Sequence, residues 1–220
     1  MINILYEDNH LLVVEKPCNM PTQQDESEDL DLLTCLKEDL KIRYNKSGNV
    51  YLGLVHRLDR PVGGIMVFAK TSKAASRLSD QIRTHQFQKT YRAIVNYNGL
   101  KKQDTWIDML KKDHKTNTSK VTSIRDPQGK EAILSYSILD INQNLACVEI
   151  SLKTGRSHQI RVQFSSRNHA LWGDQRYNPS AKENQQIALW AYSIRFIHPT
   201  TKQQLEFKLN PPNQFPWNLF

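Results

Sequence analysis

The chain has 220 residues, of which 39% are hydrophobic and 24% charged, and its formal net charge is +8. This composition is ordinary for one soluble globular protein. It contains no apolar run of about 18 residues, which excludes a transmembrane helix. Its three cysteines lie far apart in the chain, which argues against a disulfide framework and against a zinc site.

The charges are distributed unevenly along the chain. Residues 1–40 contain two lysines and ten acidic residues, whereas residues 41–220 contain 28 lysines and arginines against 12 acidic residues. A strongly basic body fits either a phosphate-rich partner or a merely basic soluble protein. The first residues lack a basic segment followed by an apolar core, so they do not form a signal peptide, and we expect a cytoplasmic protein.

The first half of the chain predicts strands and two helices. Short strands are expected over residues 4–6 and 11–14, joined by a turn at Asp8 and Asn9. Leucines at helical spacing predict a helix over residues 30–44. Thr71 is the expected cap of a second helix, whose apolar positions repeat every four residues: Ala74, Leu78 and Ile82.

The second half predicts mostly strands. These are expected over residues 88–95, 131–139, 145–152, 187–196 and 204–209. Residues 101–130 form the most polar and basic part, which fits either an insertion facing a charged partner or a plain exposed hairpin. A short helix is expected to begin with Ser157 as its cap. This order predicts one α+β domain over residues 1–220, with a mixed, mostly antiparallel central sheet and flanking helices.

One acidic residue stands inside a basic, glycine-containing loop. The sequence His-Arg-Leu-Asp-Arg-Pro-Val-Gly-Gly, residues 56–64, lies between two apolar stretches. Arg60 precedes a proline and is biased away from helical geometry, so Asp59 is expected on a connection between two strands. His56, Arg57 and Arg60 suit a carboxylate that must stay charged near a polyanion. The alternative is an ordinary turn aspartate that pairs with its neighbours.

A second cluster, Gly-Arg-Ser-His-Gln-Ile-Arg, occupies residues 155–161. If the segment from His158 is helical, then His158, Arg161 and Val162 share one face. Arg161 would then point toward the site that holds Asp59. Taken alone, this cluster would be an ordinary amphipathic helix start.

Together the two clusters resemble the pseudouridine synthases of the RluA type. Further blocks of that family occur in the same order: residues 6–8, 16–17, 68–71, 89–93, 173–177 and 196–199. Two departures occur. The family's turn after the aspartate usually reads Arg-Asp-Thr-Ser-Gly, whereas here residues 60–64 read Arg-Pro-Val-Gly-Gly, and Trp190 stands where the family usually has histidine.

The resemblance implies a pseudouridine synthase fold with a central cleft. Many relatives carry a small basic RNA-binding module, but nothing before Tyr6 could form one, so we expect no N-terminal accessory RNA-binding domain. The resemblance also implies isomerisation of uridines in ribosomal or transfer RNA stem-loops, and we expect a monomer. This reaction involves no net redox change and no carried group, so neither a metal nor an organic cofactor is expected. If the partner is RNA, residues 101–130 form either an insertion that faces the RNA or an exposed hairpin.

The resemblance also implies roles for individual residues. Asp59 is the expected nucleophile, because a nearby guanidinium keeps a carboxylate charged. Arg161 is implied to pair with it, and Tyr91 to stack on the uracil and assist proton removal. Leu189 is implied as the apolar wall under the base, and Arg57 as the residue that fills the space of the extruded uridine.

The remaining site residues are basic. Arg60, Arg156 and Arg167 are expected to contact phosphates. His56 and His158 fit either framework hydrogen bonds or proton transfer. Two other functions remain open: an N-glycosidic hydrolase, which normally needs a second carboxylate that neither cluster supplies, and a catalytically silent RNA-binding protein of the same fold.

Overall fold

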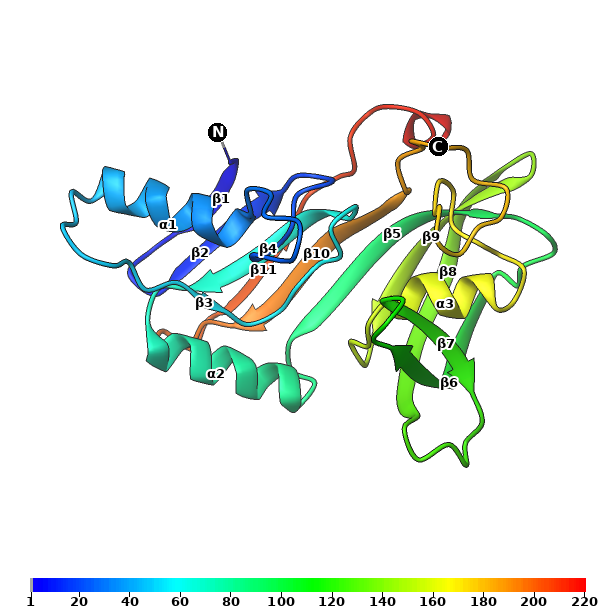
Figure 1. Ribbon diagram of the computed structural model, residues 1–220, viewed down its shortest axis with the longest axis horizontal. Helices are drawn as coiled ribbons and strands as arrows, with labels where there is room; N and C mark the ends of the chain where they lie inside the picture. The colour runs from blue at the N-terminus through cyan, green and yellow to red at the C-terminus, as the bar shows by residue number, and fades with distance from the viewer. Residues whose placement is uncertain (1) are drawn as a thin grey trace. The chain divides into compact units, whose positions relative to one another are not determined.

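The computed structural model describes residues 2–220 and divides them into two compact units. The first unit consists of the chain up to Lys89 together with Ala191–Asn210. The second consists of Thr90–Trp190 together with Pro211–Phe220. Figure 1 labels the α-helices and strands of both units.

The first unit is an antiparallel sheet with two helices. Its strands lie in the order β1, β2, β4, β10, with β3 beside β4 and β11 beside β10. The elements are β1 (Ile4–Glu7), β2 (Leu11–Lys16), α1 (Leu32–Arg43), β3 (Gly53–Leu54), β4 (Gly63–Ala69), α2 (Ser72–Arg83), β10 (Leu189–Ile197, from Ala191 on) and β11 (Gln204–Lys208).

The core of this unit lies on both faces of β2 and β4. Val13 is opposite Val67 in the antiparallel register, and successive strand residues point to opposite faces. One face packs against Ala74 and Leu78 of α2. All residues of β4 are buried, so this strand is covered on both sides, which fits its continuous apolar sequence.

The expected cap of the second helix at Thr71 is confirmed, whereas the first helix begins at Leu32, two residues later than expected, with Asp31 as its cap. The side chain of Asp31 accepts a hydrogen bond of 3.0 Å from the Thr34 backbone N–H at the start of α1. The Thr71 hydroxyl accepts one of 3.2 Å from Ala74 N–H at the start of α2. Each cap satisfies a backbone donor that has no partner inside the helix.

The second unit has its strands in the order β5, β9, β8, β6, β7, with antiparallel registers. Its elements are β5 (Gln88–Asn96, from Thr90 on), β6 (Gln103–Asp113), β7 (Thr118–Thr122), β8 (Lys130–Asn142), β9 (Leu145–Leu152), α3 (Gln159–Ser165) and the 3-10 turn η1 (Trp217–Leu219). The polar segment 101–130 therefore contains a hairpin, β6–β7, with an exposed basic tip.

The start of α3 differs from the sequence prediction. The residue before the helix is His158, not Ser157, and it has left-handed backbone angles (φ 54°, ψ 23°) with no side-chain cap. Such angles are uncommon outside glycine. Every helix residue from Gln159 to Phe164 is buried, so tertiary packing rather than a capping side chain holds this short helix.

Candidate functional site

Asp59 lies on the connection between β3 and β4, as the sequence predicts. Its backbone carbonyl accepts a hydrogen bond of 3.0 Å from Val62 N–H, which closes a turn. Leu58 on one side of Asp59 is buried, and Arg57 is exposed. The loop therefore anchors Leu58 in the core and leaves Arg57 exposed, with Asp59 half-buried.

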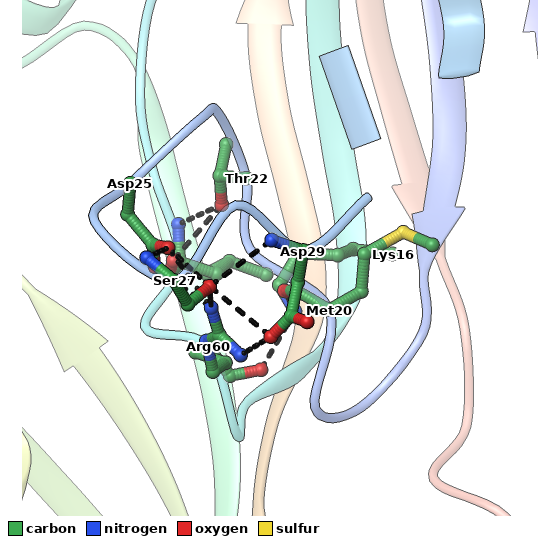
Figure 2. A network of polar contacts seen from close by, with 8 residues as sticks. Lys16, Met20, Thr22, Asp25, Ser27, Asp29 and Arg60 are labelled. Carbon is green, nitrogen blue, oxygen red and sulfur yellow. Dashed lines mark hydrogen bonds and ion pairs between the residues drawn. The ribbon is translucent and has the colours of Figure 1, made fainter. Parts of the chain in front are cut away.

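A buried lysine contacts the backbone of this loop (Figure 2). Lys16 is completely buried, and its ammonium donates hydrogen bonds to the carbonyls of Pro17 (2.8 Å), Met20 (2.7 Å) and Arg60 (3.0 Å). Burial lowers the pKa of Lys16 to about 8, although the charge of Asp59 acts in the opposite direction. The ammonium thus holds the backbone immediately after Asp59 in place.

A further hydrogen bond holds the loop at Leu58, the residue before Asp59. The Thr22 hydroxyl donates a hydrogen bond of 2.9 Å to the carbonyl of Leu58. The last residue of β2 and the segment that follows it are therefore bonded to the backbone on both sides of Asp59.

Arg60 is paired within the protein. Its guanidinium contacts Asp25 (3.0 Å), Asp29 (2.5 Å) and the Ser27 hydroxyl, all from one acidic segment (Figure 2). These oxygens accept hydrogen bonds from the same Arg60 N–H groups that would bind a phosphate. Sequence reasoning did not anticipate these partners.

His56 has a framework contact. Its Nε2 accepts a hydrogen bond of 3.2 Å from Val67 N–H of β4, and its ring lies 5.6 Å from that of Phe87. Burial, with a smaller contribution from the charge of Lys89, lowers the pKa of His56 to about 3. A neutral ring with an accepting Nε2 carries its proton on Nδ1, so this geometry favours the framework alternative over proton transfer.

Tyr91 and Leu189 are both buried residues of strands. Tyr91 is in β5, opposite Ile150 of β9, and its side chain is 8% exposed. Leu189 is the first residue of β10 and is 5% exposed. Their burial fits an apolar slot for a base and also an ordinary core position.

Arg161 is held by a carboxylate and an aromatic ring. Its Nε and Nη2 donate hydrogen bonds of 2.8 and 2.7 Å to the two carboxylate oxygens of Asp174. Its guanidinium carbon lies 5.1 Å from the centre of the Tyr177 ring. The Arg161 and Asp174 side chains are 7% and 0% exposed, so this is a buried ion pair.

His158 also belongs to this arrangement. Its Nδ1 lies 2.7 Å from the hydroxyl of Tyr177, which accepts a further hydrogen bond from Ser119 N–H. This contact favours the framework alternative for His158. Asp174 and Tyr177 belong to the Gly-Asp-Gln-Arg-Tyr block, to which the sequence alone assigned no role.

The other predicted phosphate contacts already have partners. Arg156 is exposed and donates a hydrogen bond of 2.7 Å to the carbonyl of Glu131. Arg167 forms a two-pronged ion pair with Asp108, with bonds of 2.9 and 3.0 Å, and stacks on Trp106 at 4.5 Å.

The site residues thus form two groups. His56, Arg57, Asp59 and Arg60 share one loop of the first unit, and Tyr91, Arg156, Arg161 and Leu189 belong to the second. Within residues 2–220, no cluster of three or more His, Cys, Asp or Glu side chains is arranged to bind a metal ion.

The model of one protein family, described as RNA pseudouridylate synthase, matches residues 10–166. The chain belongs to the RNA pseudouridylate synthase family. The matched region includes both sequence clusters, and it makes the chain an isomerase that acts on uridine in RNA.

Curated relatives agree with this family. Ribosomal large subunit pseudouridine synthase D of Zymomonas mobilis is 33% identical over 222 residues, covering 96% of this chain and 69% of that protein. Ribosomal large subunit pseudouridine synthase C of Buchnera aphidicola is 32% identical over 216 residues, covering 92% and 64%. The chain spans about two thirds of the length of these relatives. They confirm that this pseudouridine synthase is of the RluA type.

Solved structures confirm the fold. Human RNA pseudouridylate synthase domain containing 4 matches with a TM-score of 0.82 and 22% identity, over 99% of this chain and 91% of that one. The expected fold class, a pseudouridine synthase fold with a mostly antiparallel sheet, is therefore correct. No helix within residues 2–220 has the length and apolar character that spanning a membrane requires.

Proposed function

We propose that this pseudouridine synthase modifies specific uridines of large-subunit ribosomal RNA and uses Asp59 as its nucleophile. The observation that carries the substrate proposal is that relatives named for the large ribosomal subunit match more than nine tenths of the chain. Asp59 is the acidic residue of the His-Arg-Leu-Asp block, inside the region that the family shares. The strongly basic body of the chain supports binding to RNA phosphates.

The reaction defines what Asp59 must do. Conversion of uridine to pseudouridine breaks the bond between ribose C1′ and uracil N1, turns the uracil, and rejoins it through C5. The Asp59 carboxylate acts at C1′, at uracil C6 or on a sugar proton, and all three routes require it to be ionised. The proton that leaves C5 is transferred to N1, so the reaction is balanced without a cofactor.

Other residues receive roles from the family motif. We assign Arg161 to orient and balance the Asp59 carboxylate, and Tyr91 with Leu189 to contact the uracil. Arg57, which is exposed beside Asp59, fills the place of the extruded uridine in a stem-loop, where extrusion costs little. One catalytic domain over residues 1–220 and a monomer complete the proposal.

The test uses purified protein and unmodified transcripts of large-subunit ribosomal RNA and of transfer RNA. Pseudouridine is mapped at each position for the wild type, Asp59→Asn and the control Asp80→Asn, whose carboxylate forms an exposed pair with Arg83. We expect isomerisation of ribosomal uridines by the wild type and by the control. Asp59→Asn should form no pseudouridine but bind RNA within about threefold of the wild type, since no phosphate-binding group is lost.

Each contrary outcome has its own meaning. Modification of transfer RNA alone would overturn the substrate proposal. Isomerisation by Asp59→Asn would overturn the nucleophile. RNA binding without isomerisation by the wild type would establish the silent RNA-binding alternative.

A further inference from the structure

Arg161 is held by two residues that follow it in the chain. Asp174 grips its Nε and Nη2, and Tyr177 lies under its guanidinium. A guanidinium has a planar fork of donors, so a two-pronged carboxylate fixes its plane as well as its position. A stacked aromatic ring restrains the same plane from one side.

Asp174 is itself held rigidly. Its Oδ1 accepts hydrogen bonds from the backbone N–H groups of Arg176 (3.1 Å) and Tyr177 (3.2 Å), and its side chain has no exposed surface. The preceding Gly173 has φ 69°, and a Cβ there would lie 2.7 Å from the carbonyl carbon of Gln186. The backbone therefore turns tightly just before the carboxylate and aims it at α3.

Tyr177 is anchored at both ends. Its hydroxyl contacts His158 Nδ1 and Ser119 N–H, both at 2.7 Å. Its backbone carbonyl accepts a hydrogen bond of 2.6 Å from the Ser165 hydroxyl at the end of α3. Tyr177 thus connects the residue before α3, the edge strand β7 and the last residue of the helix.

We propose that Asp174 and Tyr177 are positioning residues that set the orientation of the Arg161 guanidinium during uridine isomerisation. The proposal rests on the proposed role of Arg161. The uracil must turn between bond breaking and bond making, so a group that balances the nucleophile has to keep its direction throughout. Small displacements of such groups reduce rates by about 100-fold.

The chain offers a matched control on the same helix segment. Arg167, just after α3, forms an equivalent fork with Asp108 and stacks on Trp106. Both pairs join an aspartate to an arginine over an aromatic ring. They differ in burial, because the Arg167 side chain is 31% exposed and that of Arg161 is 7% exposed.

The experiment compares Asp174→Asn, Asp108→Asn and Tyr177→Phe in the full chain. Single-turnover rates are measured with excess enzyme on unmodified large-subunit ribosomal RNA, together with RNA dissociation constants and thermal unfolding. We expect Asp174→Asn to lower the rate about 100-fold and to leave the dissociation constant within about threefold. Asp108→Asn should keep the single-turnover rate within about threefold, because it releases only Arg167, an expected phosphate contact, and leaves the pair of Arg161 with Asp174 intact.

Tyr177→Phe covers the case in which Asp174→Asn fails to fold. It keeps the ring under Arg161 and removes only the hydroxyl contacts, so it should fold and lower the rate by about tenfold at unchanged RNA affinity. Equal rates for the wild type and Tyr177→Phe, or for folded Asp174→Asn and Asp108→Asn, would overturn the inference while the proposed function stands. An inactive wild type would overturn both.

Discussion

The ammonium of Lys16 donates a hydrogen bond of 3.0 Å to the backbone carbonyl of Arg60, 44 positions later in the chain. The same nitrogen donates to the carbonyls of Pro17 and Met20. A buried charge whose hydrogen bonds go to neutral carbonyls is expensive, since it loses its hydration, and the attraction of the Asp59 charge is smaller than the cost of burial. The burial of Lys16 therefore lowers the stability of the fold, while its hydrogen bond to Arg60 fixes the loop next to Asp59.

We predict that Lys16→Met is more stable, relative to the wild type, near pH 7 than near pH 10.5. Burial lowers the pKa of Lys16 from 10.5 to about 8. Between these values the unfolded chain binds a proton that the folded chain does not, so the wild type gains stability as the pH rises from about 8 to 10.5 and loses it as the pH falls. This change is on the order of 3 kcal/mol.

The measurement is urea unfolding of both proteins between pH 7 and pH 10.5. The free energy of unfolding of the wild type minus that of Lys16→Met should rise across this range, whereas a constant difference would contradict the prediction. The isomerase rate of Lys16→Met should fall at both pH values, because the carbonyls of Met20 and Arg60 lose their common donor.

The acidic segment around Arg60 is predicted to compete with RNA. Asp25 and Asp29 form ion pairs with the guanidinium of Arg60, the residue after Asp59, and both carboxylates are exposed. Hydrogen bonds from Ser27, together with Arg60, lower the pKa of Asp25 to about 2, so it is ionised throughout the neutral range. Asp25→Asn combined with Asp29→Asn should raise RNA affinity several-fold, up to about tenfold, because exposed ion pairs are weak.

The control removes the same charge without touching the pair. Glu26 and Glu28 belong to the same segment but are not partners of Arg60 within residues 2–220. Glu26→Gln with Glu28→Gln should raise affinity less, through long-range repulsion alone. Equal gains from the two double variants, measured by filter binding at constant salt, would show that the Arg60 contacts do not compete with RNA.

The contact between His198 and Asp8, which are 190 positions apart in the chain, predicts that the fold is sensitive to acid. His198 Nδ1 accepts hydrogen bonds from Thr200 and Thr201 N–H, so Nε2 carries the proton and donates to Asp8 at 2.8 Å. Burial alone would raise the pKa of Asp8, but hydrogen bonds from the backbone at His10 and Leu11 and from His198 hold it below 3.8.

We expect Asp8→Asn to reduce the free energy of unfolding by about 1–3 kcal/mol at pH 7. The contribution of Asp8 is present above its ordinary pKa of 3.8 and is lost as the pH falls through the lower folded value. The difference between the wild type and the variant should therefore shrink toward pH 3 in chemical unfolding. A difference that is the same at pH 7 and pH 3 would assign no ionic role to this carboxylate.

The sequence predicted local features better than distant ones. The cap at Thr71 and the strand–loop–strand placement of Asp59 depend on neighbouring residues, and the structure has both. The predicted cap at Ser157 was wrong, because α3 is held by burial and begins after a left-handed His158.

The missed partners are all remote in sequence. Asp174 lies 13 positions from Arg161, and Asp29 lies 31 positions from Arg60. No periodicity links such pairs, because folding alone brings them together. Positive charge at Arg60 and Arg161 was therefore visible in the sequence, whereas the carboxylates that hold these side chains were not.

The glycine turn after Asp59 predicts how much a Cβ at Gly64 would destabilise the fold. Gly64 has φ 122°, a region that side chains rarely adopt, and a Cβ there would lie 2.6 Å from the Ala191 nitrogen of β10. Gly99 also has a positive φ, 73°, but a Cβ there would meet nothing within 4 Å. Gly99→Ala therefore measures backbone strain alone, about 1 kcal/mol, and Gly64→Ala adds a clash with backbone.

We expect Gly64→Ala to lower the free energy of unfolding by at least about 3 kcal/mol, or to prevent folding, whereas Gly99→Ala stays close to the wild type. Where Gly64→Ala folds, β4 must move away from β10, and the Asp59 loop at its start moves with it. Isomerisation should then fall together with stability. Equal thermal unfolding of the two variants would mean that the strands separate at no cost, and the tight approach of Gly64 to Ala191 would then play no part in holding the loop.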